Sequence, residues 1–73
     1  MNLFQRNSWF DEITPVMKYD VMCRDHFRCV FCGASASDGH NLFVEHIVPL
    51  SEGGETDFDN LRTVCGKCLR EKY

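Results

Sequence analysis

The stretch CVFCGASASDGHNLFVEHIVPLSEGGETDFDNLRTVCGKC, residues 29–68, decides the fold of this chain. It begins and ends with two cysteines separated by two residues, at Cys29/Cys32 and at Cys65/Cys68. Two such pairs let four thiolates surround one ion at about 2.3 Å, the closed tetrahedral arrangement of structural zinc sites. Two disulfides or one redox-active pair are the alternatives, but neither explains the shared spacing, and a thioredoxin-like site needs a βαβ context that is missing. The stretch therefore predicts a zinc ribbon with four cysteine ligands.

The small size of the chain also favours a bound metal. A domain of 73 residues buries only about 60% of its unfolded surface and usually needs a staple. The first twenty residues contain no apolar run long enough for a signal peptide or a membrane span. We therefore expect a cytoplasmic protein with reduced thiols, in which the fifth cysteine, Cys23, lies in the core.

Local signals predict two helices and a hairpin. Thr14 and Pro15 are typical of an N-cap and a first helical position, so a helix is expected from there to about Arg24, with Val16 and Val21 in its apolar stripe. Strands are expected over residues 42–48 and 61–64, followed by a helix over residues 69–73. We expect one domain, with residues 1–28 as an N-terminal segment and helix and residues 29–73 as the core. The fold class is small α+β.

Several short motifs in this order resemble the HNH endonuclease family in its zinc-bound ββα-metal form. They are R-D before the first cysteine pair, E-H-I-V-P, a Gly-Gly turn, D-N-L and the second cysteine pair, and they extend from about Lys18 to Lys72. The resemblance implies a β-hairpin and a helix that clamp one divalent cation, Mg²⁺ or Mn²⁺, against the phosphate to be cleaved. It also implies DNA as the substrate.

The resemblance assigns a role to three polar residues. His46 matches the general base that takes a proton from the attacking water, and an imidazole suits this task near neutral pH. Glu45 matches the position of a ligand to the catalytic cation, and Asn60 matches the asparagine that braces the hairpin loop and orients the histidine. Taken alone, His46 would be a core imidazole and Asn60 would close an Asx turn.

The adjacent positions of Glu45 and His46 create a geometric problem. Neighbouring side chains in a regular strand point to opposite faces, so the two should not converge. We therefore expect a bulge or a strong local twist near this position.

One position departs from the family pattern. The family places Asn or His directly after the last cysteine, facing the cation, whereas this chain has Leu69. Three explanations remain open: waters fill the position, His40 or Glu71 reaches in, or the site is inactive. His26 is a weaker candidate for a functional role, and we expect that it could form a hydrogen bond near the first cysteine pair, Cys29/Cys32.

Charge is unevenly distributed along the chain. The net charge is −3. Residues 38–59 carry six acidic residues and no Lys or Arg, whereas residues 61–73 carry four Lys or Arg residues and one acidic residue. The expected DNA-phosphate contacts are Arg62, Lys67, Arg70 and Lys72, with ordinary helix-surface charge as the equal alternative. The N-terminal aromatic residues are expected to pack rather than to stack on bases: Phe4, Trp9 and Phe10.

The sequence thus predicts a metal-dependent DNA endonuclease or nicking enzyme of low sequence specificity. Such a small domain would work as a homodimer or with phage or restriction partner proteins. The rival hypothesis is a non-catalytic zinc ribbon that binds nucleic acid or protein. Leu69 favours the rival hypothesis, and the Glu45, His46 and Asn60 set opposes it.

Overall fold

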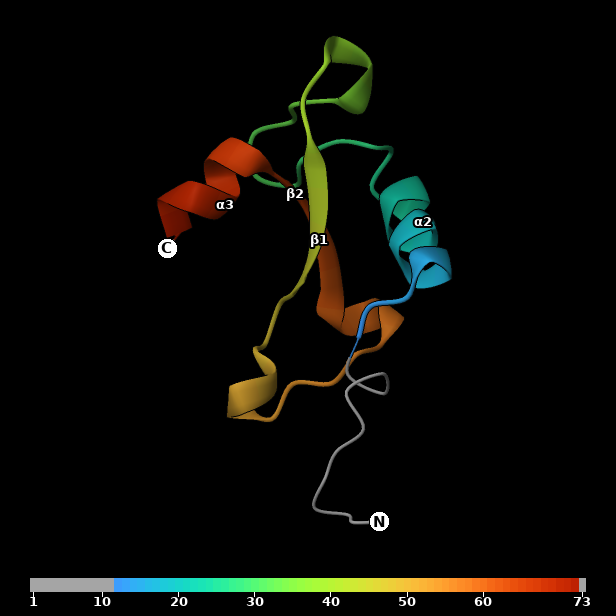
Figure 1. Ribbon diagram of the computed structural model, residues 1–73, viewed down its shortest axis with the longest axis vertical. Helices are drawn as coiled ribbons and strands as arrows, with labels where there is room; N and C mark the ends of the chain where they lie inside the picture. The colour runs from blue at the N-terminus through green and yellow to red at the C-terminus, as the bar shows by residue number, and fades with distance from the viewer. Residues whose placement is uncertain (1–11, 73) are drawn as a thin grey trace.

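The computed structural model describes residues 12–72, and it describes side chains as far as Glu71; Phe4, Trp9 and Phe10 lie outside the described residues. Two antiparallel strands form the centre, and a helix lies on each side of them in Figure 1. The elements in chain order are α2 (Pro15–Arg24), η1 (Ala36–Asp38), β1 (Leu42–His46), η2 (Leu50–Glu52), η3 (Phe58–Asn60), β2 (Leu61–Cys65) and α3 (Gly66–Lys72). The small α+β fold is therefore confirmed.

The hairpin is regular along its whole length. Its register runs from the pair Leu42 and Cys65 to the pair His46 and Leu61 without a skipped residue. The expected bulge is therefore wrong, and the side chains of Glu45 and His46 leave the sheet on opposite faces. β1 also ends earlier than expected, because the chain bends after His46.

Helix α2 begins where the sequence predicts. The hydroxyl of Thr14 accepts a hydrogen bond from the N–H of Met17 at 3.2 Å, and Pro15 fills the first helical position. Val21 is fully buried under the hairpin, whereas Val16 is 70% exposed. Cys23 is also exposed. The apolar stripe was expected to pack in the core with both Val16 and Cys23, and this was wrong for these two residues, because the narrow hairpin covers only one stripe of the helix.

The end of α2 is fastened to the outer edge of β2. The guanidinium of Arg24 donates to the carbonyl of Leu61 at 2.7 Å, and the carboxylate of Asp25 accepts from the N–H of Thr63 at 3.0 Å. Arg24 and Asp25 are themselves paired at 2.9 Å. Burial raises the pKa of Asp25, but the bonds from Arg24 and Thr63 outweigh it and lower the pKa overall. The R-D motif therefore supplies hydrogen-bond partners to a backbone carbonyl and a backbone N–H at the edge of β2 that does not pair with β1.

Replacing Asp25 with Ala is expected to lower the free energy of unfolding by about 1–3 kcal/mol, because the N–H of the fully buried Thr63 loses its acceptor. Urea denaturation of the metal-loaded protein measures the change. Asp20→Ala, at an exposed position of the same helix, is the control and should stay within about 0.5 kcal/mol of the parent. Equal stability of both variants would contradict the fastening role.

The first cysteine knuckle follows a sharp turn after α2. His26 and Phe27 both adopt left-handed φ angles, of 59° and 54°. The side chain of His26 is exposed, and its N–H donates to the carbonyl of Cys23 at 3.1 Å. His26 therefore shapes the turn through its backbone rather than through the expected side-chain bond. Gly33, at φ 80°, closes the knuckle in a conformation that other residues rarely adopt.

The second cysteine pair spans the junction of β2 and α3, with Cys68 in the first turn of the helix. Cys65 is the last residue of β2, and α3 begins at Gly66, three residues before the predicted start. A cysteine spacing of three places Cys68 one turn above Cys65, so the helix itself brings the two sulfurs to one side. Within the described residues, no helix has the length and apolar character needed to cross a membrane.

The apolar core is small. Among the described residues, the fully buried apolar side chains are Val21, Leu61 and Val64, and the thiols of Cys29 and Cys65 are almost as buried. Cys29, Val64 and Cys65 form one cluster, against which partly buried side chains such as Leu69 pack. Cys29 and Cys65 are thus part of the core.

Candidate active site and metal centre

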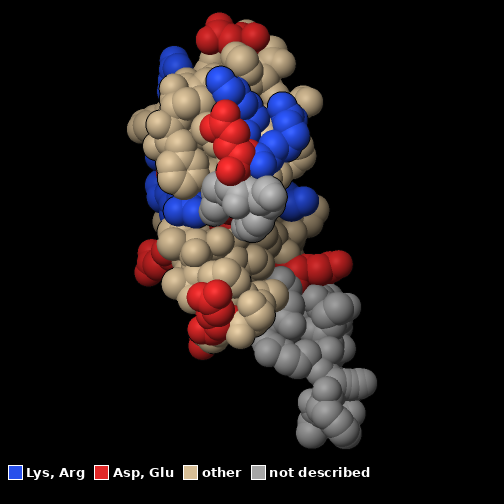
Figure 2. Space-filling model, turned by 90° about the vertical axis from the view of Figure 1, so that its left-hand side faces the viewer, with Lys and Arg blue, Asp and Glu red and all other residues tan. Residues whose placement is uncertain are grey.

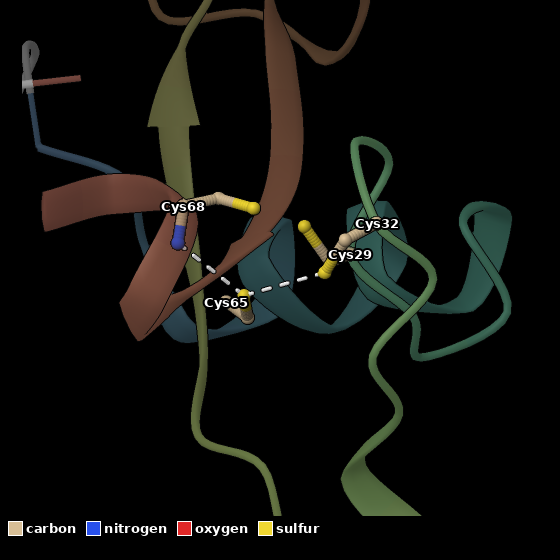
Figure 3. A group of neighbouring side chains, drawn as sticks. All are labelled: Cys29, Cys32, Cys65 and Cys68. Carbon is tan, nitrogen blue, oxygen red and sulfur yellow. Dashed lines mark hydrogen bonds between the residues drawn. The ribbon is translucent and has the colours of Figure 1, made fainter. Parts of the chain in front are cut away.

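Four cysteine sulfurs meet at one end of the hairpin. Cys29 and Cys32 approach from the knuckle, and Cys65 and Cys68 from the junction of β2 and α3 (Figure 3). The four Sγ atoms lie within 4.8 Å of one another, and those of Cys32 and Cys65 are 3.6 Å apart. Sulfurs around zinc at about 2.3 Å are separated by roughly 3.8 Å, whereas a disulfide is about 2.05 Å long. The cluster therefore fits a closed structural zinc site.

The electrostatics of the cluster are consistent with a bound cation. Burial raises the pKa of the Cys29 thiol, but backbone N–H groups of Cys32, Cys65 and Phe31 outweigh it and lower this pKa to about 6. Burial and the three neighbouring thiols raise the pKa of Cys68 to about 12. Four adjacent sulfurs can all be thiolates only when a positive ion offsets their mutual repulsion.

His46 lies at the opposite end of the hairpin, as the last residue of β1. Its Nε2 atom is 2.7 Å from the hydroxyl of Thr56, so the imidazole is held from the loop before η3. When Nε2 carries the proton and donates to Thr56, Nδ1 carries the lone pair. The histidine is half-buried, with its ring held on one side.

Asn60 ties this loop to the end of β1. Its side-chain amide donates to the carbonyls of Val48 and Glu55, at 3.1 and 2.8 Å, and its Oδ1 accepts from the N–H of Val48 at 2.9 Å. Gly54 makes the loop fit, because a Cβ there would lie 1.8 Å from the carbonyl oxygen of Val48. The side chain that closes an Asx turn here is that of Asp57 rather than Asn60. Its carboxylate accepts from the N–H of Asn60 and caps η3.

Glu45 lies in an ion pair on the other face of β1. Its Oε2 accepts from Nε of Arg62, the residue directly opposite on β2, at 2.8 Å. The guanidinium of Arg62 also lies 4.7 Å from the ring centroid of Phe31. The side chains of Glu45 and Arg62 are only 11% and 21% exposed.

Leu69 packs inward. It is partly buried against the cluster of Cys29, Val64 and Cys65. A leucine has no atom that coordinates a cation, so α3 contributes no ligand at this position.

Two hollows lie at opposite ends of the hairpin. A hollow of about 300 Å³ is lined by Glu45 and His46, together with Ile13 and residues 49–51. His40 lines a different hollow, of about 260 Å³, beside Lys67 and Arg70. His40 therefore lies away from the hollow that His46 lines, and Glu71 is exposed.

Basic side chains gather on the face that carries α3. Figure 2 shows that Lys and Arg groups gather over the upper half of this face, where acidic groups also lie among them and at the top, whereas the charged groups over the lower half are acidic. Lys67 and Arg70 are exposed, whereas Arg62 turns toward Glu45. The side chain of Lys72 lies outside the described part.

The family comparison agrees with this arrangement. The family model described as HNH endonuclease matches residues 29–73, which is 45 of the 73 residues. The chain belongs to the HNH endonuclease family. The matched segment contains both cysteine pairs, His46 and Asn60. HNH nucleases act on DNA.

Two curated proteins resemble parts of this HNH chain. The type IV methyl-directed restriction enzyme EcoKMcrA of Escherichia coli is 34% identical over 64 residues, which cover 81% of this chain and 23% of the enzyme. Anaredoxin of Nostoc is 35% identical over 46 residues, which cover 60% of this chain and 54% of that protein. The chain thus spans about a quarter and about half of these relatives. No solved structure matches the chain.

Three contacts around this HNH site were not expected from the sequence. Thr56 holds His46, Phe31 lies under Arg62, and Arg62 pairs with Glu45. The opposite charges at positions 45 and 62 gave a signal for the last contact, because an antiparallel register can place them opposite each other. Thr56 carries no such signal, since its contact depends on the path of the loop that follows β1.

Proposed function

We propose that this domain is a metal-dependent DNA endonuclease that nicks DNA with low sequence specificity. The observation that carries the proposal is the position of His46. It ends β1, bonds to Thr56 and lies within the segment that the HNH family model matches. His46 and Glu45 line one hollow, although their side chains leave the strand on opposite faces. A half-buried imidazole with one nitrogen held by a hydroxyl is suited to act as a general base.

In the proposed reaction, Nδ1 of His46 takes a proton from water while the water oxygen bonds to phosphorus. The bond from phosphorus to the 3′ oxygen breaks, and solvent protonates that oxygen, which leaves 5′-phosphate and 3′-hydroxyl ends. Asn60 keeps the loop closed against Val48, so that Thr56 continues to orient the imidazole. Lys67 and Arg70 would contact phosphates of the DNA backbone.

Glu45 is the residue that would hold the divalent cation. Mg²⁺ is commonly bound by one or two carboxylates, several waters and phosphate oxygens, so one carboxylate fits a weak site of this kind. A bound Mg²⁺ or Mn²⁺ would stabilise negative charge on the phosphoryl and departing oxygens. Among the described residues, the four cysteines form the only close group of three or more metal-binding side chains.

The second candidate function is a zinc-stapled module that binds nucleic acid or protein without cleaving it. Two observations favour it: Leu69 packs into the core, and Glu45 is already paired with Arg62. The basic face around α3 could serve binding alone.

A plasmid-nicking assay separates the two functions. The zinc-loaded protein is incubated with supercoiled DNA in Mg²⁺ or Mn²⁺, and open circles are measured against time. We expect slow nicking that requires the added cation. Supercoiled DNA that stays intact in both metals, with a natively folded protein and with Leu69→Asn, would support the binding module instead.

Leu69→Asn is expected to raise the nicking rate at low Mg²⁺ by roughly tenfold. An amide oxygen is a suitable ligand for Mg²⁺, and tenfold tighter binding requires only about 1.4 kcal/mol. Leu69→Ala is the matched control, because it loses the same core packing without adding a ligand. No gain for Asn over Ala would mean that position 69 does not face the cation.

We also propose that the domain acts with other proteins or as a homodimer. A domain of this size contacts few base pairs, and the region matched in the restriction enzyme is only 23% of that enzyme's length. Sedimentation of the protein with and without DNA would measure the oligomeric state.

A further inference from the structure

The ion pair between Glu45 and Arg62 occupies the position at which the proposed cation would bind. The carboxylate is 11% exposed and its Oε2 is 2.8 Å from Nε of Arg62. A buried carboxylate needs a positive partner, and Arg62 supplies one permanently. A divalent cation must therefore share this carboxylate with the guanidinium or displace it.

Three features hold Arg62 in place. The strand register sets it directly opposite Glu45, and residues paired in this way have Cβ atoms only about 5 Å apart. The ring of Phe31, 4.7 Å away, supports the guanidinium from the knuckle. The side chain is only 21% exposed, so little water screens the pair. Arg28, by contrast, is exposed and donates to the carbonyl of Gly33.

We propose that Arg62 sets the affinity of this domain for the divalent cation by competing for the Glu45 carboxylate. The inference rests on the proposed function only in placing the cation at Glu45. It makes Arg62 a positioning residue that keeps cation binding weak in the absence of DNA. Arg62 is thereby distinguished from the exposed Lys67 and Arg70, which remain available to phosphates.

The test measures Mn²⁺ binding to the zinc-loaded protein without DNA, by titration calorimetry and by the electron paramagnetic resonance signal of free Mn²⁺. Arg62→Gln should bind Mn²⁺ about tenfold more tightly than the parent, which corresponds to about 1.4 kcal/mol. Arg62→Lys should fall between the two, because a lysine keeps the charge but lacks the planar fork that stacks on Phe31. Adding Glu45→Gln to Arg62→Gln should abolish the gain.

Arg28→Gln is the matched control, because it removes the same charge from an exposed position and should leave the Mn²⁺ affinity unchanged. Phe31→Leu is a second variant that keeps Arg62 but removes the ring beside it, and it should tighten binding by about twofold to threefold. Circular dichroism and zinc content verify that each variant is folded. Equal affinity of the parent, Arg62→Gln and Phe31→Leu, or no binding by any of them, would overturn the proposal.

This experiment does not depend on DNA cleavage. If the parent fails to nick DNA but Arg62→Gln gains Mn²⁺ affinity through Glu45, the proposed function fails and the inference holds. If the parent nicks DNA and Arg62→Gln shows no gain, the inference fails and the proposed function holds.

Discussion

The domain is expected to unfold when the metal is removed from its four cysteines. The described apolar core is limited to a few side chains, and two of its most buried members are Cys29 and Cys65 of the cysteine cluster. Zinc binding to small domains contributes about 10–16 kcal/mol, whereas a typical domain is stable by only about 5–15 kcal/mol. Loss of the ion therefore exceeds what the remaining contacts can supply.

Far-UV circular dichroism and amide proton NMR spectra, recorded during titration with a chelator, measure this loss. Cys65→Ser should reproduce the unfolded spectrum even with excess zinc. Cys23→Ser is the matched control, because this cysteine is exposed and lies outside the cluster, and it should bind one zinc ion and fold like the parent. A folded protein with no zinc would refute the role of the cluster.

His46→Ala is expected to reduce the nicking rate by about 100-fold to 10,000-fold, the usual contribution of a general base. The fold should be retained, because the half-buried imidazole bonds to one loop hydroxyl and lies far from the cysteine cluster along the hairpin. Initial rates on supercoiled plasmid at saturating Mg²⁺ measure the effect.

Two further variants test the specificity of this result. Thr56→Val removes the hydroxyl that holds Nε2 of His46, and it should reduce the rate by roughly tenfold, as for other groups that orient a functional histidine. His40→Ala removes an exposed histidine at the other end of the hairpin and should leave the rate unchanged. Parental activity in His46→Ala would rule out this histidine as the base.

The features set by short spacing could be predicted from the sequence. Two residues between cysteines determine how far apart their sulfurs can lie, so the cluster followed directly from positions 29, 32, 65 and 68. The start of α2 followed from Thr14 and Pro15 because both act on the adjacent backbone. These signals depend on local geometry, which does not change with the rest of the fold.

The features set by tertiary packing could not be predicted in the same way. Cys23 was expected on the apolar side of α2, yet it is exposed because a two-stranded hairpin covers only a narrow stripe of the helix. The end of β1 depends on Asn60, which binds the N–H of Val48 from across the whole loop. The pair of Glu45 and Arg62 depends on a register that nothing local determines. The functional roles of His46, Glu45 and Asn60 stay predictions.

The hairpin is closed at both ends by different means. Leu42 and Cys65 pair beside the metal cluster, and His46 and Leu61 pair beside the loop that Asn60 holds. An isolated two-stranded hairpin is only marginally stable in water, but here neither end is free to open first. Hydrogen exchange of the paired strand amides should therefore occur only when the whole unit opens, at one common rate that the release of the metal accelerates.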